Sequence, residues 1–148
     1  MNAAAACAAG VPREAATLLP PAAAWQAAAE RHAELFDALD PGASIALVAR
    51  SAPQTMLLWE ARERGVSARA QPFPGYTASG ADIALAADDE ALDAIRASSD
   101  ATLFAVLREH IRSGRIVCYM LRRRCQLEER GFDELLDALG FAFMGACR

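Results

Sequence analysis

The chain has 148 residues, of which 54% are hydrophobic and 23% charged, and its formal net charge is −4. This length suits one domain with a sizeable core, and the composition is that of a globular protein. The acidic balance argues against nucleic-acid binding, because domains with that role carry a basic surface. No apolar run approaches the roughly 20 residues that a membrane-spanning helix needs.

The cysteines give no metal signature. Their spacings form no CxxC pair and match no zinc motif; they are Cys7, Cys118, Cys125 and Cys147. With only two histidines besides, we predict no metal site. The first residues lack the basic and strongly apolar segments of a signal peptide. We therefore expect a cytoplasmic protein whose thiols stay reduced.

The N-terminal region divides into an arm and the start of a domain. Residues 1–22 are rich in Ala and Pro, and Pro20 and Pro21 interrupt any long helix. We predict a flexible or loosely docked arm there, followed by one α/β domain over 23–148. An apolar stripe at helical spacing predicts a helix over 22–39.

A strand and a second helix are expected next. Ser44–Ala49 is a short continuous apolar run between chain-breaking residues. Such a run is typical of a strand buried on both faces, as in a parallel sheet. Ser51 and Gln54 have capping-box spacing, and Pro53 suits the first turn of a helix. The pattern therefore predicts a helix over 51–64.

The rest of the chain alternates between strand and helix patterns. Strands are predicted over 66–71, 82–87, 115–121 and 141–144, with a loop over 76–80. Helices are predicted after the acidic run at 88–90, after Asp100 and over 132–139. Alternation of this kind predicts an α/β fold: a small, mostly parallel, Rossmann-like sheet of four to five strands, with helices on both faces.

Three short motifs resemble the class I S-adenosylmethionine-dependent methyltransferase fold. Asp82–Asp88 (DIALAAD) resembles its fourth strand, Leu103–Val117 its passage from a helix into a Gly-led strand, and Leu139–Phe141 (LGF) its terminal element. The resemblance runs from about Leu35 to Met144. It also extends to a bacterial family of small methyltransferase-like proteins of unknown function. The resemblance implies a shortened sheet ordered 2-1-4-5 in the family's numbering, with a terminal strand.

The residues that hold the cofactor in that family have no counterparts here. The family needs glycine after the first strand so that the backbone can approach the cofactor, whereas residues 50–53 are Arg-Ser-Ala-Pro. The second strand should end in an acidic residue but ends in Gln71-Pro72. The segment from Gln71 to Asp82 is too short for the usual third strand. We therefore predict no cofactor and no catalytic residue.

One candidate ligand site remains, at the point where such a sheet binds its ligands. The fold would place Arg50, Ser51 and Gln54 opposite Asp88 and Asp89. In one interpretation they form a small pocket for an anion or a nucleotide-like ligand. In the other they are a helix cap, a pair of acids at a helix N-terminus and an Arg50–Asp88 ion pair that closes the gap.

Other reactive residues have a structural and a functional interpretation. Arg122–Arg124 adjoin Cys125 and would lower its thiol pKa, as in a redox sensor, or bind phosphate; alternatively they are a solvated charged loop. Cys118 is expected to be inert in the core. His110 lies at the edge of an apolar helical stripe and has no catalytic partner nearby in the sequence.

The sequence favours a non-catalytic, methyltransferase-like domain that works through protein contacts, with another protein or as a homodimer. Phe73 and Tyr76 lie in a Pro- and Gly-rich loop. We expect them to contribute to a protein contact or to cover an open sheet edge. The alternative is a small nucleotide- or anion-binding protein, or a minimal enzyme, that uses Arg50, Ser51 and their neighbours.

Overall fold

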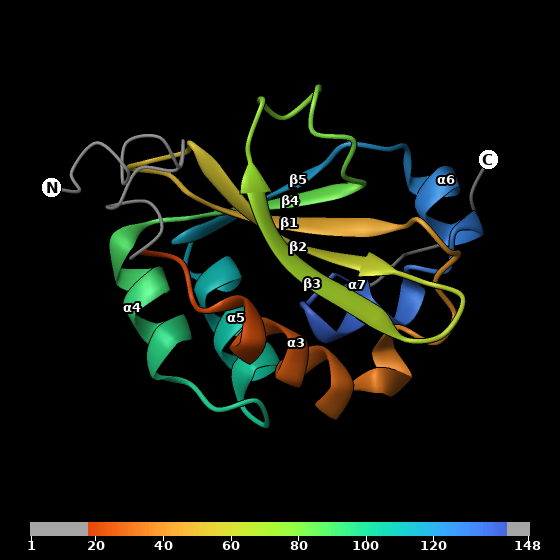
Figure 1. Cartoon of the computed structure of the whole chain (residues 1–148), viewed down its shortest axis with the longest axis horizontal. Coiled ribbons are helices and arrows are strands. Elements are labelled where there is room, and N and C mark those ends of the chain that lie inside the picture. The colour runs from red at the N-terminus through yellow and green to blue at the C-terminus, as the bar shows by residue number, and fades with distance from the viewer. Residues whose placement is uncertain (1–17, 142–148) are drawn as a thin grey trace, which may run out of the picture.

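The computed structural model describes residues 18–141, which form one five-stranded sheet with helices packed against it (Figure 1). The strand order across the sheet is β3-β2-β1-β4-β5. The strands are β1 (Ser44–Ala49), β2 (Thr55–Ala61), β3 (Val66–Pro72), β4 (Ile83–Ala87) and β5 (Ile116–Met120). All strands predicted within the described residues are confirmed to within one residue at each end, and β2 was not predicted.

The sheet is mixed rather than mostly parallel. β1 and β4 are parallel, from Ile45 opposite Ile83 to Ala49 opposite Ala87. The pairs β1–β2, β2–β3 and β4–β5 are antiparallel. The predicted mostly parallel, Rossmann-like sheet is therefore wrong. The expected neighbour of β1 was the strand at 66–71, but β2 lies between them and reverses the chain direction twice.

β2 replaces the helix that the sequence predicted over 51–64. Residues 56–59 are Met-Leu-Leu-Trp, all buried, because a central strand is covered on both faces. Such a run shows no alternation, so periodicity alone does not separate a strand from a buried helix. The hairpin that follows reverses at Gly65, whose φ of 79° suits glycine.

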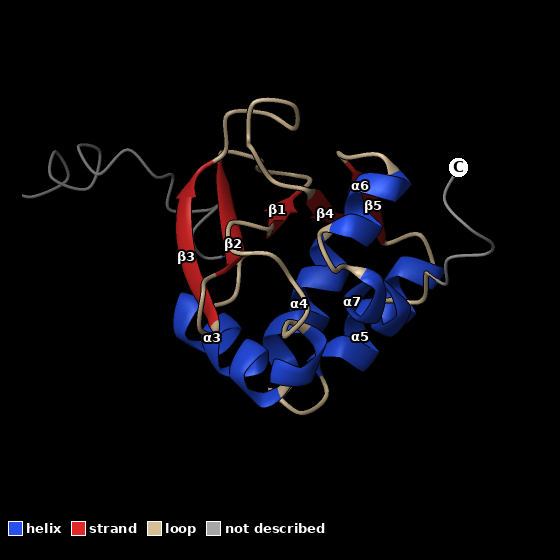
Figure 2. Cartoon of the chain, turned by 90° about the vertical axis from the view of Figure 1, so that its right-hand side faces the viewer, coloured by secondary structure: helices blue, strands red, loops and turns tan. Residues whose placement is uncertain are grey.

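Most of the helices lie on one face of the sheet. They are α3 (Ala22–Arg31), the short 3-10 helix η1 (Ala33–Leu35), α4 (Asp89–Ala97), α5 (Leu103–Arg112), α6 (Arg124–Glu129) and α7 (Asp133–Ala138). Figure 2 shows α3, α4, α5 and α7 together on the same side. The predicted arrangement with helices on both faces is therefore wrong. Within residues 18–141, no helix is both long and apolar enough to cross a bilayer.

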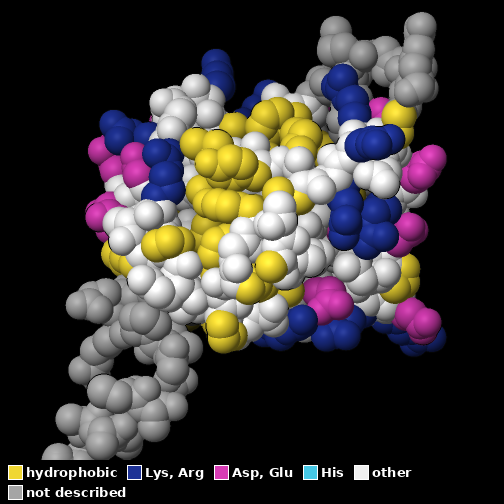
Figure 3. All heavy atoms as spheres, turned by 90° about the horizontal axis from the view of Figure 1, so that it is seen from above, with side chains coloured by type: hydrophobic (Ala, Val, Ile, Leu, Met, Phe, Trp, Pro, Cys, Tyr) yellow, Lys and Arg dark blue, Asp and Glu magenta, His cyan; other side chains and the backbone are white. Residues whose placement is uncertain are grey.

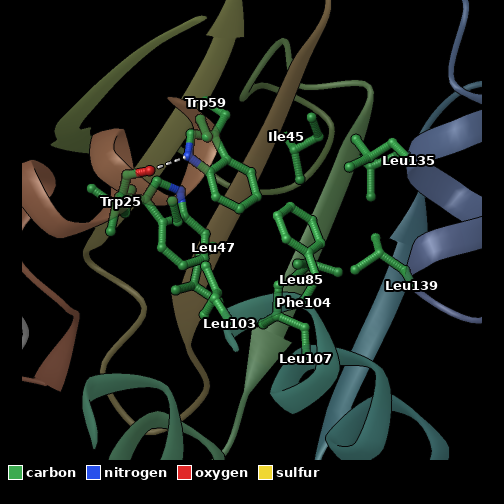
Figure 4. Close-up of a cluster of buried hydrophobic side chains, with 14 of the residues drawn as sticks. Trp25, Ile45, Leu47, Trp59, Leu85, Leu103, Phe104, Leu107, Leu135 and Leu139 are labelled. Carbon is green, nitrogen blue, oxygen red and sulfur yellow. Dashed lines mark hydrogen bonds between the residues drawn. The ribbon is translucent and has the colours of Figure 1, made fainter. Parts of the chain in front are cut away.

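The main core lies between the sheet and these helices. Trp25 of α3 stacks on Trp59 of β2, with ring centroids 4.0 Å apart, and the Trp59 indole N–H donates to the Trp25 carbonyl at 2.7 Å (Figure 4). Phe104 of α5 stacks on the other side of Trp59 at 5.5 Å. Leu47 and Leu85 contribute from β1 and β4. These contacts fix α3 and α5 against the centre of the sheet.

The opposite face of the sheet, here called the open face, carries small and aliphatic side chains. They form a second buried cluster: Ala46, Val48, Met56, Leu58, Ala81, Ala84 and Ala86. The loop between β3 and β4 stands over this face (Figure 1), and its Phe73 and Tyr76 pack on the cluster. A loop rather than a helix therefore covers the open face.

Both ends of the described region bear on the predicted domain limits. Leu19 is buried in the main core, and α3 begins at Ala22. The rest of the predicted arm, residues 1–17, lies outside the described residues. The predicted strand at 141–144 also lies outside them, apart from Phe141.

Candidate functional site

Four of the five predicted ligand residues meet at one end of the β1–β4 pair. Because these strands are parallel and in register, the residues that follow each of them leave the sheet at the same edge. There Arg50, Ser51, Asp88 and Asp89, together with Glu90, line an open depression of about 460 Å³. The parallel pair therefore produces the gathering that the sequence predicted.

Arg50 fills the space between the strand ends. Its Nη2 donates to the carbonyls of Gly114 and Arg115, both at 3.0 Å, and its Nε lies 3.4 Å from the Ala86 carbonyl. The expected Arg50–Asp88 ion pair is not formed. Asp88 pairs with Arg115 instead, at 3.3 Å. Arg50 thus ties β4 to the start of β5 through backbone carbonyls.

The acidic residues at this edge are also satisfied by the protein. Asp88 caps α4 by accepting a hydrogen bond from the Ala91 N–H at 2.8 Å. This bond, with Arg115 nearby, lowers the pKa of the Asp88 carboxyl. Ser51 Oγ donates to Asp89 at 2.7 Å, and Arg115 also pairs with Glu90 at 3.1 Å. The depression therefore presents groups already engaged with one another.

Gln54, the fifth predicted residue, does not join them. It is exposed just before β2, and its backbone carbonyl accepts a hydrogen bond from Phe73 N–H at 2.9 Å. The predicted Ser51–Gln54 capping box does not exist, because the chain continues into a strand rather than a helix.

Asp82 is a polar anchor that the sequence interpretation missed. Its carboxylate is 1% exposed and accepts a hydrogen bond from the Ser44 N–H at 3.0 Å. Arg122 Nε lies 2.9 Å from Oδ1, and Arg130 Nε lies 3.4 Å from Oδ2. An acidic residue directly before an apolar strand, in a chain rich in Arg, was the available signal. Arg122 and Arg123 are both exposed, and the Arg122 guanidinium pairs with this buried acid.

The other reactive residues have structural environments. Cys125 is disulfide-bonded, so the expectation of reduced thiols is wrong for this residue, and the redox-sensor interpretation has no free thiol there. Cys118 is a free thiol packed against the core, where burial raises its pKa to about 12. His110 Nδ1 is hydrogen-bonded to the Val106 carbonyl one turn earlier. In the described part of the chain, no three His, Cys, Asp or Glu side chains gather as metal ligands.

A chain of aromatic rings lies on the open face. Phe73 contacts Tyr76 edge to face at 5.0 Å between centroids, and Tyr76 contacts Tyr119 of β5 at 4.5 Å. We call these three residues the aromatic surface. Tyr119 is 41% exposed, while burial and the neighbouring Tyr119 raise the pKa of the Tyr76 hydroxyl. Figure 3, which looks onto this face, shows hydrophobic side chains gathered in its middle.

A separate cleft of about 420 Å³ lies at the far end of the β2–β3 hairpin, beside α3 and η1. Its apolar wall includes Ala29, Phe36 and Val66, and charged residues of both signs surround it. Nothing in the sequence pointed to this cleft. It has a suitable volume for a small ligand, but its mixed charges favour no particular ligand chemistry.

Comparison with known proteins assigns no family. No family model and no curated protein matches the chain. A solved structure titled "UbiJ-SCP2 Ubiquinone synthesis protein" is similar, with a TM-score of 0.36 and 19% identity over 94% of this chain and 93% of that one. A likeness of this size supports no functional argument. The methyltransferase resemblance is wrong, because it implies a mostly parallel sheet, whereas three of the four strand pairs that the structure describes are antiparallel.

Proposed function

We propose that this chain is a non-catalytic protein-binding module that recognises its partner through the aromatic surface. The observation that carries the proposal is the contact chain Phe73–Tyr76–Tyr119. It leaves Tyr119 41% exposed on the open face, whose buried cluster includes no helix residue among those that the structure describes. Tyrosines are enriched in protein interfaces, since they offer a large apolar ring and a hydroxyl at a small entropic cost.

The arrangement of the rings favours binding without reorganisation. Tyr119 comes from a strand, and Tyr76 is held between Phe73 and Tyr119. Ser79 fixes the loop that carries Tyr76, because its hydroxyl donates to the Tyr76 carbonyl at 2.8 Å. Side chains that are already ordered lose little freedom on association, so more of the contact energy contributes to affinity.

The depression at Arg50 supports the alternative, ligand binding, less well. A binding site for an anion offers unpaired donors, whereas the Arg50 guanidinium donates to two backbone carbonyls. Asp88 and Asp89 add negative charge beside it. An anion entering this edge would have to displace protein contacts and face two carboxylates.

Site-specific photocrosslinking tests the proposal. A photoreactive phenylalanine replaces Tyr119 in cells of the source organism, and the same residue replaces exposed Ala105 on α5 as the control. We expect position 119, and not position 105, to capture a defined protein. That protein, once purified, should bind the native chain, with at least about a tenfold loss for Tyr119→Ala and little loss for Tyr119→Phe.

Two outcomes would overturn the proposal. Equal capture at both positions would mean that the aromatic surface has no special role. Binding of the purified protein that is unchanged in Tyr119→Ala would place the contact elsewhere on the molecule.

A further inference from the structure

The outer edge of β5 offers unpaired backbone groups. Asp88 N–H donates to the Arg115 carbonyl and Leu121 N–H donates to the Asp82 carbonyl, both at 2.9 Å. Hydrogen bonding alternates along antiparallel strands, so the backbone N–H and C=O groups of Val117 and Tyr119 also point toward β4. The N–H and C=O groups of the other three residues point outward; they are Ile116, Cys118 and Met120. Within residues 18–141, no strand pairs with them.

The opposite edge of the sheet is protected, which makes the β5 edge unusual. On β3, the Gln26 side chain of α3 donates to the Val66 carbonyl at 2.7 Å and accepts from Ala68 N–H at 2.8 Å. β3 also carries Arg69 and Pro72, which discourage pairing with another strand. Thus a helix side chain covers the β3 edge, whereas no strand of the described region, residues 18–141, pairs with the β5 edge.

The composition of β5 is that of a strand that pairs with another strand on both sides. Its sequence, Ile-Val-Cys-Tyr-Met, contains no charge, proline or glycine. Tyr119 and Met120, at 41% and 38% exposure, are the exposed large hydrophobic residues of the described region. An apolar edge strand of this kind is a template for strand addition.

We propose that a second copy of the chain pairs with this edge, β5 against β5 in antiparallel orientation, to make a continuous ten-stranded sheet. The pairing is centred on Cys118, because only that register matches all three outward-facing residues with one another. Ile116 then lies opposite Met120 of the other copy. On the open face, Val117 lies opposite the other copy's Tyr119.

The charges at the two ends of β5 suit this two-fold arrangement. The end beside α4 carries three carboxylates, Asp88, Asp89 and Glu90, against Arg50 and Arg115. The other end carries Arg122 and Arg123 beside the buried Asp82. In antiparallel pairing, the α4 end of β5 in each copy lies next to the Arg122 end of β5 in the other copy. The excess carboxylates of one copy then meet the excess guanidinium groups of the other. A second copy therefore fits this edge in charge as well as in backbone pattern.

This inference goes beyond the proposed function, because it uses the backbone edge of β5 rather than the ring faces. A two-fold axis between antiparallel strands is perpendicular to the sheet, so both aromatic surfaces would lie on the same side of the dimer. The module would then present two equivalent binding surfaces to a partner.

Disulfide crosslinking tests the register. Opposed residues without mutual hydrogen bonds lie about 4.5 Å apart at their Cα atoms, close enough for a disulfide. Cys118 would lie opposite its own counterpart in this register, so every sample carries Cys118→Ser. Val117→Cys and Tyr119→Cys variants in this background are oxidised with copper phenanthroline separately and as a mixture, with the Cys118→Ser chain as the control for the remaining cysteines. We expect a crosslinked dimer above this control only in the mixture.

The separate samples exclude the neighbouring registers. Crosslinking of Val117→Cys alone would centre the pairing on residue 117, and crosslinking of Tyr119→Cys alone would centre it on residue 119. Either result would overturn the proposed register, and no crosslink above the control in any sample would overturn the pairing.

Sedimentation of the whole chain tests the dimer itself. We expect the native chain to be dimeric, Met120→Lys to be monomeric because a charge enters the paired edge, and Ala70→Lys on β3 to remain dimeric. A native chain that is monomeric up to its solubility limit would overturn the inference, as would a dimer that persists unchanged in Met120→Lys. Since Met120→Lys leaves the aromatic surface intact, its capture of a partner through position 119 reports on the proposed function separately.

Discussion

At the residue scale, Asp82 connects parts of the chain that are far apart in sequence. Its carboxylate accepts a hydrogen bond from the start of β1 and lies beside Arg122, after β5, and Arg130, after α6. It is 1% exposed, so the charge depends on these partners. One side chain thereby helps to hold the end of the β5 edge strand in place.

We expect Asp82→Asn to lower the free energy of unfolding by about 2–3 kcal/mol, because two guanidinium groups and the Ser44 amide lose a charged acceptor. The cost stays below that of a fully buried ion pair, since both arginines are partly exposed. Urea unfolding measures it. Asp137→Asn, at an exposed position of α7, is the matched control and should change stability by less than about 0.5 kcal/mol. Equal effects would show that Asp82 is not an anchor.

The Trp25–Trp59 pair gives a second test at this scale. Trp59→Phe keeps an aromatic ring in the core but removes the indole N–H that donates to the Trp25 carbonyl. We expect a loss of about 2 kcal/mol from the hydrogen bond and the smaller buried ring, measured by urea unfolding. Tyr119→Phe, which removes one hydroxyl from an exposed ring, should have almost no effect on stability. A comparable loss in both variants would contradict this assignment.

At the element scale, β2 shows where the sequence patterns mislead. Ser51, Pro53 and Gln54 are compatible with a helix start, but they occupy the turn between two antiparallel strands. The deciding fact is tertiary, because Trp59 packs on Trp25 and Phe104 only when residues 55–61 are extended. β1 and β4 were predicted because charged or chain-breaking residues flank them, so the sequence itself marks where each strand begins and ends.

The start of α4 allows a prediction about pH. Asp88 accepts the Ala91 N–H and its pKa is lowered from the ordinary value of 3.8. We expect Asp88→Ala to cost about 1 kcal/mol near neutral pH, as loss of an N-cap does. Because the folded pKa is the lower one, the carboxylate stabilises the fold above pH 3.8. Its contribution is lost as the pH falls through the lowered folded value.

Chemical unfolding over a pH series checks this prediction. The stability difference between the native chain and Asp88→Ala should be constant near neutral pH and shrink in acid. Asp88→Asn separates the two contributions, since asparagine also caps helices but carries no charge. It should retain more stability than Asp88→Ala and show less of the acid dependence. A difference that grows in acid would contradict the lowered pKa.

For the whole molecule, the sequence was a better guide to which segments lie close together than to the fold. Arg50 and Asp88 meet because β1 and β4 are parallel, and the prediction of those two strands sufficed for this. Their role as a ligand site stays a prediction. The family resemblance failed because a succession of strand and helix patterns does not specify strand direction. The sequence also did not predict the exposure of Tyr119, because this exposure depends on β5 being an edge strand.

Amide hydrogen exchange tests both the strand order of the sheet and the proposed dimer. Amides of β1 and β4, at the centre of the sheet, should exchange most slowly. In β5, Val117 and Tyr119 donate to β4 and should be protected at every protein concentration. The outward-facing amides, those of Ile116, Cys118 and Met120, should exchange quickly in dilute solution and slow down as the concentration rises.

How the exchange of these outward-facing amides depends on protein concentration shows whether the same chain, a second copy or nothing pairs with the β5 edge. Protection of the outward-facing amides that does not change with concentration would mean that the same chain covers its own β5 edge, and the dimer would then have no strand to pair with. Fast exchange at all concentrations would leave the edge bare. Only protection that follows the monomer–dimer equilibrium, and is lost in Met120→Lys but kept in Ala70→Lys, agrees with pairing of two β5 strands.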